Sequence, residues 1–284
     1  MHGELHAVMI DRDWRTAREG TKPGCSASPL AARWLFIHSA IRKGEGKGMT
    51  QDEFIPVFDW FANQHTIEAR AEFVEQIGSV LTSLFQPGDR VLDLCCGAGA
   101  IAFYLEDQGA NVTAIDFAPS LIAMARKEAT KRRSRITFIQ DNVLTGPLGN
   151  EEYDLAVCLG NAIMDFPHQD FSRFRDRVYQ ALKSGGHFAV GYRDGVLRVM
   201  TMSEPKEVIE EGAEGQIERR FKRYDPARGA FVAEYRHLVT GQVYEGTAYV
   251  YTGPMIRVLL EVGFGFDRSI RLSESSFLDI FVKQ

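Results

Sequence analysis

The stretch from Val91 to Ala102 constrains the fold of this chain more than any other. It begins with an apolar run that is typical of a parallel strand covered on both faces. Gly97 and Gly99 follow, and glycine allows the backbone to turn sharply and to approach a ligand closely. Gly-x-Gly-x-x-Ala is an accepted form of the turn between strand and helix that binds nucleotide-type ligands. The stretch therefore predicts a nucleotide-type cofactor site.

Acidic residues on two predicted strands sharpen this interpretation. Asp93 lies within the first strand, and a second strand, residues 111–116, ends in Asp116. An acid at the end of the second strand can accept hydrogen bonds from both hydroxyls of a ribose. The glycine spacing alone is weak evidence, because nicotinamide enzymes, flavoproteins and chance loops also contain it.

Strands and helices alternate after this point, which predicts a parallel sheet with right-handed crossovers. The predicted fold class is α/β, a Rossmann-like doubly wound and mostly parallel seven-stranded sheet. An apolar helical pattern covers residues 66–85, and Pro254 and Gly263 bound a late helix. The predicted strands are residues 91–95, 111–115, 136–140, 154–159, 187–191, 264–271 and 276–282.

The pattern of polar and apolar residues changes between residues 203 and 251. Three segments alternate there with turn sequences between them, which predicts an antiparallel β insertion after strand five. This insertion lies where a lid would be, because ligands bind beyond the carboxyl ends of the strands. We expect residues 49–284 to form the main domain and residues 1–48 to be a poorly ordered, dispensable extension, with an alternative start at Met49.

Composition limits the kinds of molecule that we expect this protein to bind. The chain has 284 residues, a net charge of −5 and 45% hydrophobic residues, so it can bury a core but offers no strong basic footprint for nucleic acid. No apolar run approaches the roughly 18 residues that span a bilayer. The four cysteines show no paired CxxC spacing, which favours a reducing, cytoplasmic setting. We expect a small-molecule partner, no nucleic acid and no membrane, and leave homo-oligomer formation open.

Asp93, Gly97, Gly99 and Asp116 together resemble motif I and the following acidic strand end of class I S-adenosylmethionine-dependent methyltransferases. A nicotinamide cofactor fits less well, because its pyrophosphate needs a helix N-terminus. The resemblance implies S-adenosyl-L-methionine as cofactor and S-adenosyl-L-homocysteine as product. No carboxylate or histidine cluster predicts a metal site.

The same resemblance assigns further cofactor contacts at the ends of the predicted strands. It places Asp141 at the adenine amino group and the next backbone amide, that of Asn142, at a ring nitrogen. An Asx turn after the strand is the structural alternative for this segment. Arg70 would contact the cofactor carboxylate, and Phe117 would cover the adenine or ribose. The remaining predicted cofactor contacts are Val143 and Leu159.

Two short segments resemble the glycine and glycine/sarcosine N-methyltransferase branch: residues 159–161 (Leu-Gly-Asn) and residues 191–193 (Gly-Tyr-Arg). In that branch, matching Asn and Arg side chains hold the substrate carboxylate, which implies this role for Asn161 and Arg193. A surface arginine is the alternative for Arg193. Phe58 and Trp60 would stack over the substrate and sulfonium, or else serve as sheet cover. The catalytic group is predicted as Asn161, Tyr192 and Arg193.

The chain also departs from the branch, because Ala162 and Ile163 follow Asn161 where the branch has Ser and Phe, and Asp165 adds a negative charge. A neutral or cationic amine acceptor therefore stays open. We expect N-methylation of an amine or amino acid by in-line displacement. O-methylation is the alternative, with Asp165, His168 or Tyr192 as base, and a non-catalytic cofactor-binding protein is the second alternative.

Overall fold

A computed structural model shows the fold of this chain and describes residues 55–197 and 207–284. The expectation of a dispensable extension over residues 1–48 lies outside the described residues. So does the first part of the predicted insertion, residues 203–206.

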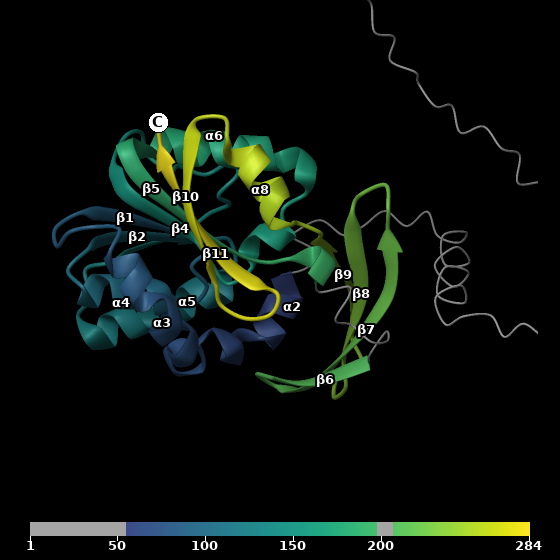
Figure 1. The fold of residues 1–284 in the computed structure, drawn as a ribbon. Coiled ribbons are helices and arrows are strands. Elements are labelled where there is room, and N and C mark those ends of the chain that lie inside the picture. The colour runs from purple at the N-terminus through teal and green to yellow at the C-terminus, as the bar shows by residue number, and fades with distance from the viewer. Residues whose placement is uncertain (1–54, 198–206) are drawn as a thin grey trace, which may run out of the picture. The chain divides into compact units, whose positions relative to one another are not determined.

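Within the described residues, one sheet has seven strands in the order β10-β11-β5-β4-β1-β2-β3, which confirms the predicted fold class (Figure 1). Strands β1 to β5 pair in parallel, and β11 runs antiparallel to both of its neighbours. The strand order reverses between β1 and β4, and ligands bind at such a switch point. The strands are β1 (Arg90–Leu94), β2 (Asn111–Asp116), β3 (Thr137–Gln140), β4 (Tyr153–Cys158), β5 (Leu182–Arg193), β10 (Phe264–Arg271) and β11 (Ser276–Lys283).

Helices cover both faces of this sheet (Figure 1). Val91 and Leu92 are both fully buried, and they belong to two different core clusters because successive side chains of a strand point to opposite faces. Val91 packs in the cluster that contains α3, α4 and α5, and Leu92 in the cluster that contains α6 and α8. The helices are α3 (Ile67–Thr82), α4 (Ala100–Asp107), α5 (Pro119–Arg132), α6 (Phe171–Ala181) and α8 (Gly253–Leu260).

A second, antiparallel sheet follows β5, as the alternating segments predicted. The sequence predicted three strands here, whereas the described residues form four, in the order β6-β7-β8-β9. The additional strand, β6, has the sequence Glu-Val-Ile-Glu-Glu-Gly, and Ile209 within it is exposed, so it lacks the apolar alternation that marks a half-buried strand. The strands are β6 (Glu207–Gly212), β7 (Gly215–Asp225), β8 (Ala230–His237) and β9 (Val243–Tyr249).

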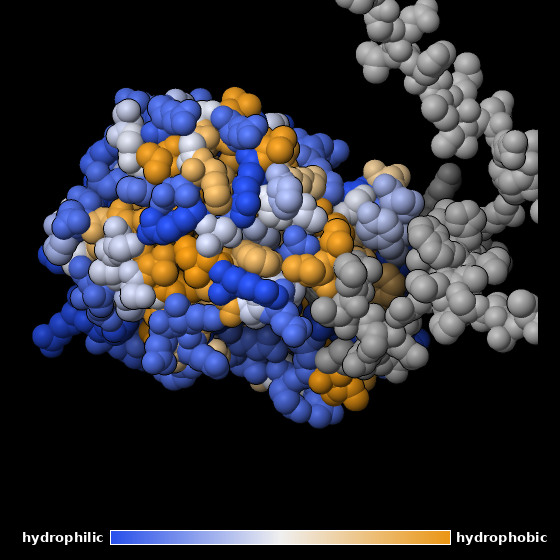
Figure 2. Space-filling model, in the orientation of Figure 1, coloured by the Kyte–Doolittle hydropathy of each residue, from blue (hydrophilic) through white to orange (hydrophobic). Residues whose placement is uncertain are grey.

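Hydrophilic residues cover much of the face shown in Figure 2, and groups of hydrophobic residues lie between them. Exposed hydrophobic side chains include Val258, Val262 and Phe266, on and beside α8. Among the described helices, none is both long enough and apolar enough to cross a membrane.

Candidate active site

A cavity of about 350 Å³ lies at the carboxyl ends of β1, β2, β3 and β4. Its volume lies within the range of small-molecule sites. Four groups of residues form its wall: the glycine turn after β1, the segments after β2 to β4, the helical region before β1, and one face of the second sheet. Because the chain folds in this order, residues that are far apart in the sequence meet here.

The turn after β1 has the backbone conformation that its glycines predicted. Gly97 and Gly99 have φ values of 56° and 86°, a region that favours glycine. A Cβ atom on Gly97 would lie 3.0 Å from Nδ1 of His65, and one on Gly99 would lie 2.9 Å from the ring of Phe138. Gly97 lines the cavity, whereas Gly99 begins α4 and packs behind the turn.

Two buried acids stand beside this turn, Asp93 on β1 and Asp116 at the end of β2, and both line the cavity. Asp93 Oδ2 has no hydrogen-bond partner among the residues that the structure describes. Burial, and then the charge of Asp116, raise the pKa of Asp93 to about 8. Asp116 accepts hydrogen bonds from the backbone N–H groups of Gly97 (2.8 Å) and Ala118 (2.9 Å), while burial raises its pKa.

The segment after β3 forms the Asx turn that was the structural alternative, and it also lines the cavity. Asp141 Oδ1 accepts the backbone N–H of Asn142 at 2.7 Å, and Asn142 Oδ1 accepts that of Leu144 at 2.8 Å. Asp141, Asn142 and Val143 all contribute to the wall. In this turn the N–H of Asn142, which was predicted to bind an adenine ring nitrogen, is already donated to Asp141. The predicted contact of Asp141 with the adenine amino group stays a prediction.

The region before β1 contributes Phe58, Arg70 and His65. Phe58, from α2 (Ile55–Trp60), meets the ring of Phe117 edge to face at 5.4 Å, and both rings line the cavity. Burial, and then the charge of Arg193, lower the pKa of Arg70. Burial and the charge of Arg70 lower the pKa of His65 to about 4, so this imidazole is neutral at pH 7.

Of the residues predicted to hold the acceptor, Asn161 and Phe58 line the cavity, as does Leu159 before Asn161. Asn161 has φ 70° and precedes a short 3-10 helix, η4 (Ala162–Asp165). Arg193 is exposed at the end of β5 and is not among the lining residues, although its charge acts on Arg70.

The structure places Tyr192 and Trp60 away from the cavity wall. Tyr192 is 2% exposed, donates a hydrogen bond to Asp279 Oδ2 at 3.2 Å and stacks on Phe277, because its place on β5 points it toward β11. Trp60 is 7% exposed and packs in a separate small cluster with Ile217 of β7. Its ring contacts His237 and Tyr244 edge to face at 5.2 and 5.1 Å.

Sequence reasoning did not assign the part of the wall that comes from the second sheet. Arg219 and Glu210 form an ion pair at 2.8 Å, and both line the cavity with Tyr235 and Ala248. Tyr235 meets Phe61 at 6.2 Å between ring centroids. No motif marks these residues; the alternation of the strands was the only signal that one face of this sheet would be covered.

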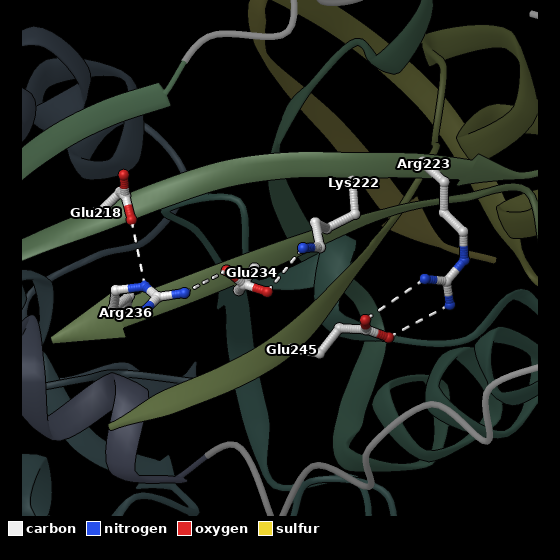
Figure 3. Close-up of polar contacts among 6 residues, drawn as sticks. All are labelled: Glu218, Lys222, Arg223, Glu234, Arg236 and Glu245. Carbon is white, nitrogen blue, oxygen red and sulfur yellow. Dashed lines mark hydrogen bonds and ion pairs between the residues drawn. The ribbon is translucent and has the colours of Figure 1, made fainter. Parts of the chain in front are cut away.

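The opposite face of the second sheet carries ion pairs, which Figure 3 shows. Glu218 and Glu234 are the strand neighbours of residues that line the cavity, so their side chains point away from it. Glu218 pairs with Arg236 at 3.4 Å and Glu234 with Lys222 at 2.8 Å, and Arg223 contacts Glu245 at 3.3 Å. This face is polar, and the face toward the cavity is the functional candidate.

Metal chemistry has no candidate site among the residues that the structure describes, since no group of three or more His, Cys, Asp or Glu side chains could hold an ion.

Residues 91–186 match a family model described as a methyltransferase domain. A demethylmenaquinone methyltransferase from Thermus thermophilus is 32% identical over 103 residues, which cover 36% of this chain and 46% of that protein. Rat glycine N-methyltransferase is 28% identical over 142 residues, which cover 45% of this chain and 48% of that protein. The matched stretches thus span about half the length of these curated relatives.

Solved structures share the fold. A protein from Pyrococcus horikoshii OT3 has a TM-score of 0.65 at 18% identity, covering 83% of this chain and all of that one. An S-adenosylmethionine-dependent methyltransferase from Clostridium acetobutylicum has a TM-score of 0.61 at 13% identity, covering 82% of this chain and 98% of that one.

The sheet order and the match over residues 91–186 agree with a class I S-adenosylmethionine-dependent methyltransferase domain, for which the cofactor is S-adenosyl-L-methionine. The predicted cofactor is thereby confirmed. The relatives include quinone and glycine methyltransferases at similar identity, so the predicted glycine N-methyltransferase branch stays a prediction.

Proposed function

We propose that this protein transfers a methyl group from S-adenosyl-L-methionine to the amine nitrogen of a small molecule. The observation that carries the proposal is one cavity whose lining includes two chemically different groups of residues. We call the glycine turn, Asp93 and Asp116 the first end, and Asn161 and the inner face of the second sheet the second end.

The first end suits the cofactor. A buried carboxylate oxygen of Asp93 has no hydrogen-bond partner among the described residues, and it fits the ammonium group of a methionine moiety, because a buried charge needs an opposite charge or a hydrogen-bond donor. In this proposal Asp116 would accept the ribose hydroxyls, Asp141 would bind the adenine amino group and Arg70 would bind the carboxylate; all three line the cavity. When bound, the cofactor supplies a methyl group on a positively charged sulfur.

The second end suits a neutral or cationic acceptor. Glu210 and Arg219 neutralise one another at 2.8 Å, and Asp165 adds a further carboxyl group to the cavity wall. A carboxyl group in a partly buried site attracts an amine and repels an anion. An amino acid acceptor would direct its amine toward Asn161 and Asp165. Arg193, which was predicted to hold its carboxylate, is not among the residues that line the cavity. The second sheet, as the predicted lid, would exclude water during transfer.

Incubation with S-adenosylmethionine labelled in its methyl group tests the proposal. The acceptor panel contains glycine, sarcosine, other primary and secondary amines, and catechol as a hydroxyl acceptor, with cofactor binding followed by calorimetry. Labelled N-methyl product supports the proposal. Label on oxygen supports the second candidate, O-methylation, which the carboxyl group of Asp165 favours as a base. Cofactor binding without any labelled product contradicts both, and favours a binding protein without transferase activity.

A further inference from the structure

We propose that Asp165 accepts the proton that the methyl acceptor loses, an inference that rests on the proposed function. Asp165 ends η4, four residues after Asn161, and it lines the same cavity. The cofactor contacts proposed for the glycine turn and for the acids at the strand ends do not involve Asp165, so its role must be argued separately.

The backbone around Asp165 is held firmly. The N–H of Met164 bonds to the carbonyl of Asn161 at 3.0 Å, and the N–H of Phe166 bonds to that of Ile163 at 3.2 Å. Met164 and Phe166 are each 3% exposed, so both neighbours of Asp165 are fixed in the core. Tyr251 donates a buried hydrogen bond of 2.9 Å to the Phe166 carbonyl. The carboxyl group is therefore presented from a rigid turn, as proton transfer requires.

Charged groups from several elements surround the cavity at this point. Asp116 comes from β2 and Cys95 from the turn after β1, and both interact electrostatically with Asp165. Glu210 and Arg219 face the cavity from the second sheet, and His65 and Arg70 from the region before β1. Burial, and then the charge of Asp116, raise the pKa of Asp165 to about 7. A carboxylate with a pKa near the working pH is an effective general base.

The other two residues considered as bases do not reach the cavity wall. The ring of His168 lies 4.7 Å from that of Tyr251, edge to face, and its Nε2 is 3.0 Å from the carbonyl oxygen of Val250. Tyr192 donates a hydrogen bond to Asp279, and burial and this carboxylate raise the pKa of the Tyr192 hydroxyl above its usual value. Of the three candidate bases, Asp165 is therefore the one that lines the cavity.

The proton balance is simple. An aliphatic amine carries an additional proton at neutral pH, and the nitrogen must lose it before its electron pair can form a bond to the methyl carbon. The bond between this carbon and the cofactor sulfur would break at the same time, and its electron pair would stay on the sulfur of the leaving S-adenosylhomocysteine. A carboxylate oxygen of Asp165 takes this proton and becomes a neutral acid. A hydroxyl acceptor would give up its single proton to the same oxygen. In both cases Asp165 returns to the carboxylate by releasing the proton to solvent.

The variant Asp165→Asn keeps the size of the side chain and removes the base. The matched control is Asp170→Asn, which lies on the neighbouring 3-10 helix η5 (His168–Asp170) and outside the cavity wall. With sarcosine as acceptor, we expect the wild-type rate to rise with pH through about 7. In Asp165→Asn we expect kcat at pH 7 to fall roughly 100-fold. Its rate should recover toward pH 9–10, where more of the amine is free, while the dissociation constant of the cofactor stays within about threefold of the wild type.

A titration of aspartate carboxyl carbons by NMR gives a reading that does not depend on turnover. We expect one signal with a midpoint near pH 7 that is absent from the Asp165→Asn spectrum. A midpoint for Asp165 below about 5, or an unchanged pH–rate profile in Asp165→Asn, would overturn the inference. If the wild-type protein binds the cofactor and methylates no acceptor, the proposed function fails instead, and the NMR titration still decides whether Asp165 is poised as a base.

Discussion

Asp116 Oδ2 accepts a hydrogen bond of 2.8 Å from the backbone N–H of Gly97, so the end of β2 holds the glycine turn that follows β1. The other carboxylate oxygen accepts the N–H of Ala118, at the start of α5. One side chain thus fixes the two loops that follow β1 and β2. It also lines the cavity, where its remaining lone pairs are available to a ribose.

We predict that Asp116→Ala weakens binding of S-adenosylmethionine at least tenfold. The variant loses two hydrogen bonds to a charged acceptor, each worth about 1.5–3 kcal/mol, and releases the glycine turn. Calorimetric titration with the cofactor measures the effect. Asp89→Ala removes a half-buried turn acid away from the cavity and serves as the control. Equal affinities in Asp116→Ala and the wild type would contradict the assigned ribose role.

We predict that Asp93→Asn stabilises the cofactor-free protein. The folded-state pKa of Asp93 is raised to about 8, so between about pH 4 and pH 8 the folded state holds a proton that the unfolded state has lost. Stability therefore falls as pH rises through this window, by up to about 1.4 kcal/mol per pH unit. The neutral amide has no such penalty. Thermal unfolding across this range should show the two proteins converging near pH 4 and diverging toward pH 8, and parallel curves would refute the prediction.

The same ionisation predicts how cofactor affinity depends on pH. To pair with an ammonium group, Asp93 must lose its proton, so binding releases one proton below pH 8. Between pH 5.5 and 7.0, where the α-amino group of the cofactor stays protonated, affinity should rise up to about tenfold per pH unit. Calorimetry in two buffers of different ionisation enthalpy counts the proton released. Asp93→Asn should bind more weakly and lose this proton release; a variant that keeps it would show that another group is titrating.

Some parts of this structure follow from the sequence and others do not. Gly97, Gly99 and Asp116 could be predicted because the turn needs glycine conformations at fixed spacing, and because a strand end delivers its last side chain to the edge of the sheet. The part of the cavity wall that comes from the second sheet could not be predicted. Trp60 looked free to stack on a ligand, but its partners, His237 and Tyr244, are distant in the sequence and lie on strands of the second sheet.

The register in which β5 pairs with β11 also explains why Tyr192 is buried and Arg193 is exposed. The two are consecutive on β5, and the pairing of β5 with β11 sets Tyr192 opposite Phe277 and near Asp279, while Arg193 stays exposed. A local motif cannot show which of two neighbouring residues faces the core, because an antiparallel partner some 80 residues away decides it.

We predict that Gly99→Ala costs more stability than Gly185→Ala, because only the first also meets a packed neighbour. Both glycines have positive φ, at 86° and 74°, so each substitution should cost about 1–2 kcal/mol through the backbone alone. A Cβ on Gly99 would also lie 2.9 Å from the Phe138 ring and 3.2 Å from that of Phe103, whereas nothing lies within 4 Å of one on Gly185.

Overpacking typically adds about 1–3 kcal/mol, so urea denaturation should separate the two variants by roughly that amount. The cofactor affinity of Gly99→Ala should also fall, because Gly99 caps α4 at the end of the glycine turn and the added methyl group would press on Phe138 and on Phe103 of that helix. Gly185→Ala should bind the cofactor as the wild type does. Equal losses of stability in the two variants would mean that the turn relaxes around the added methyl group, and that backbone conformation alone requires glycine at residue 99.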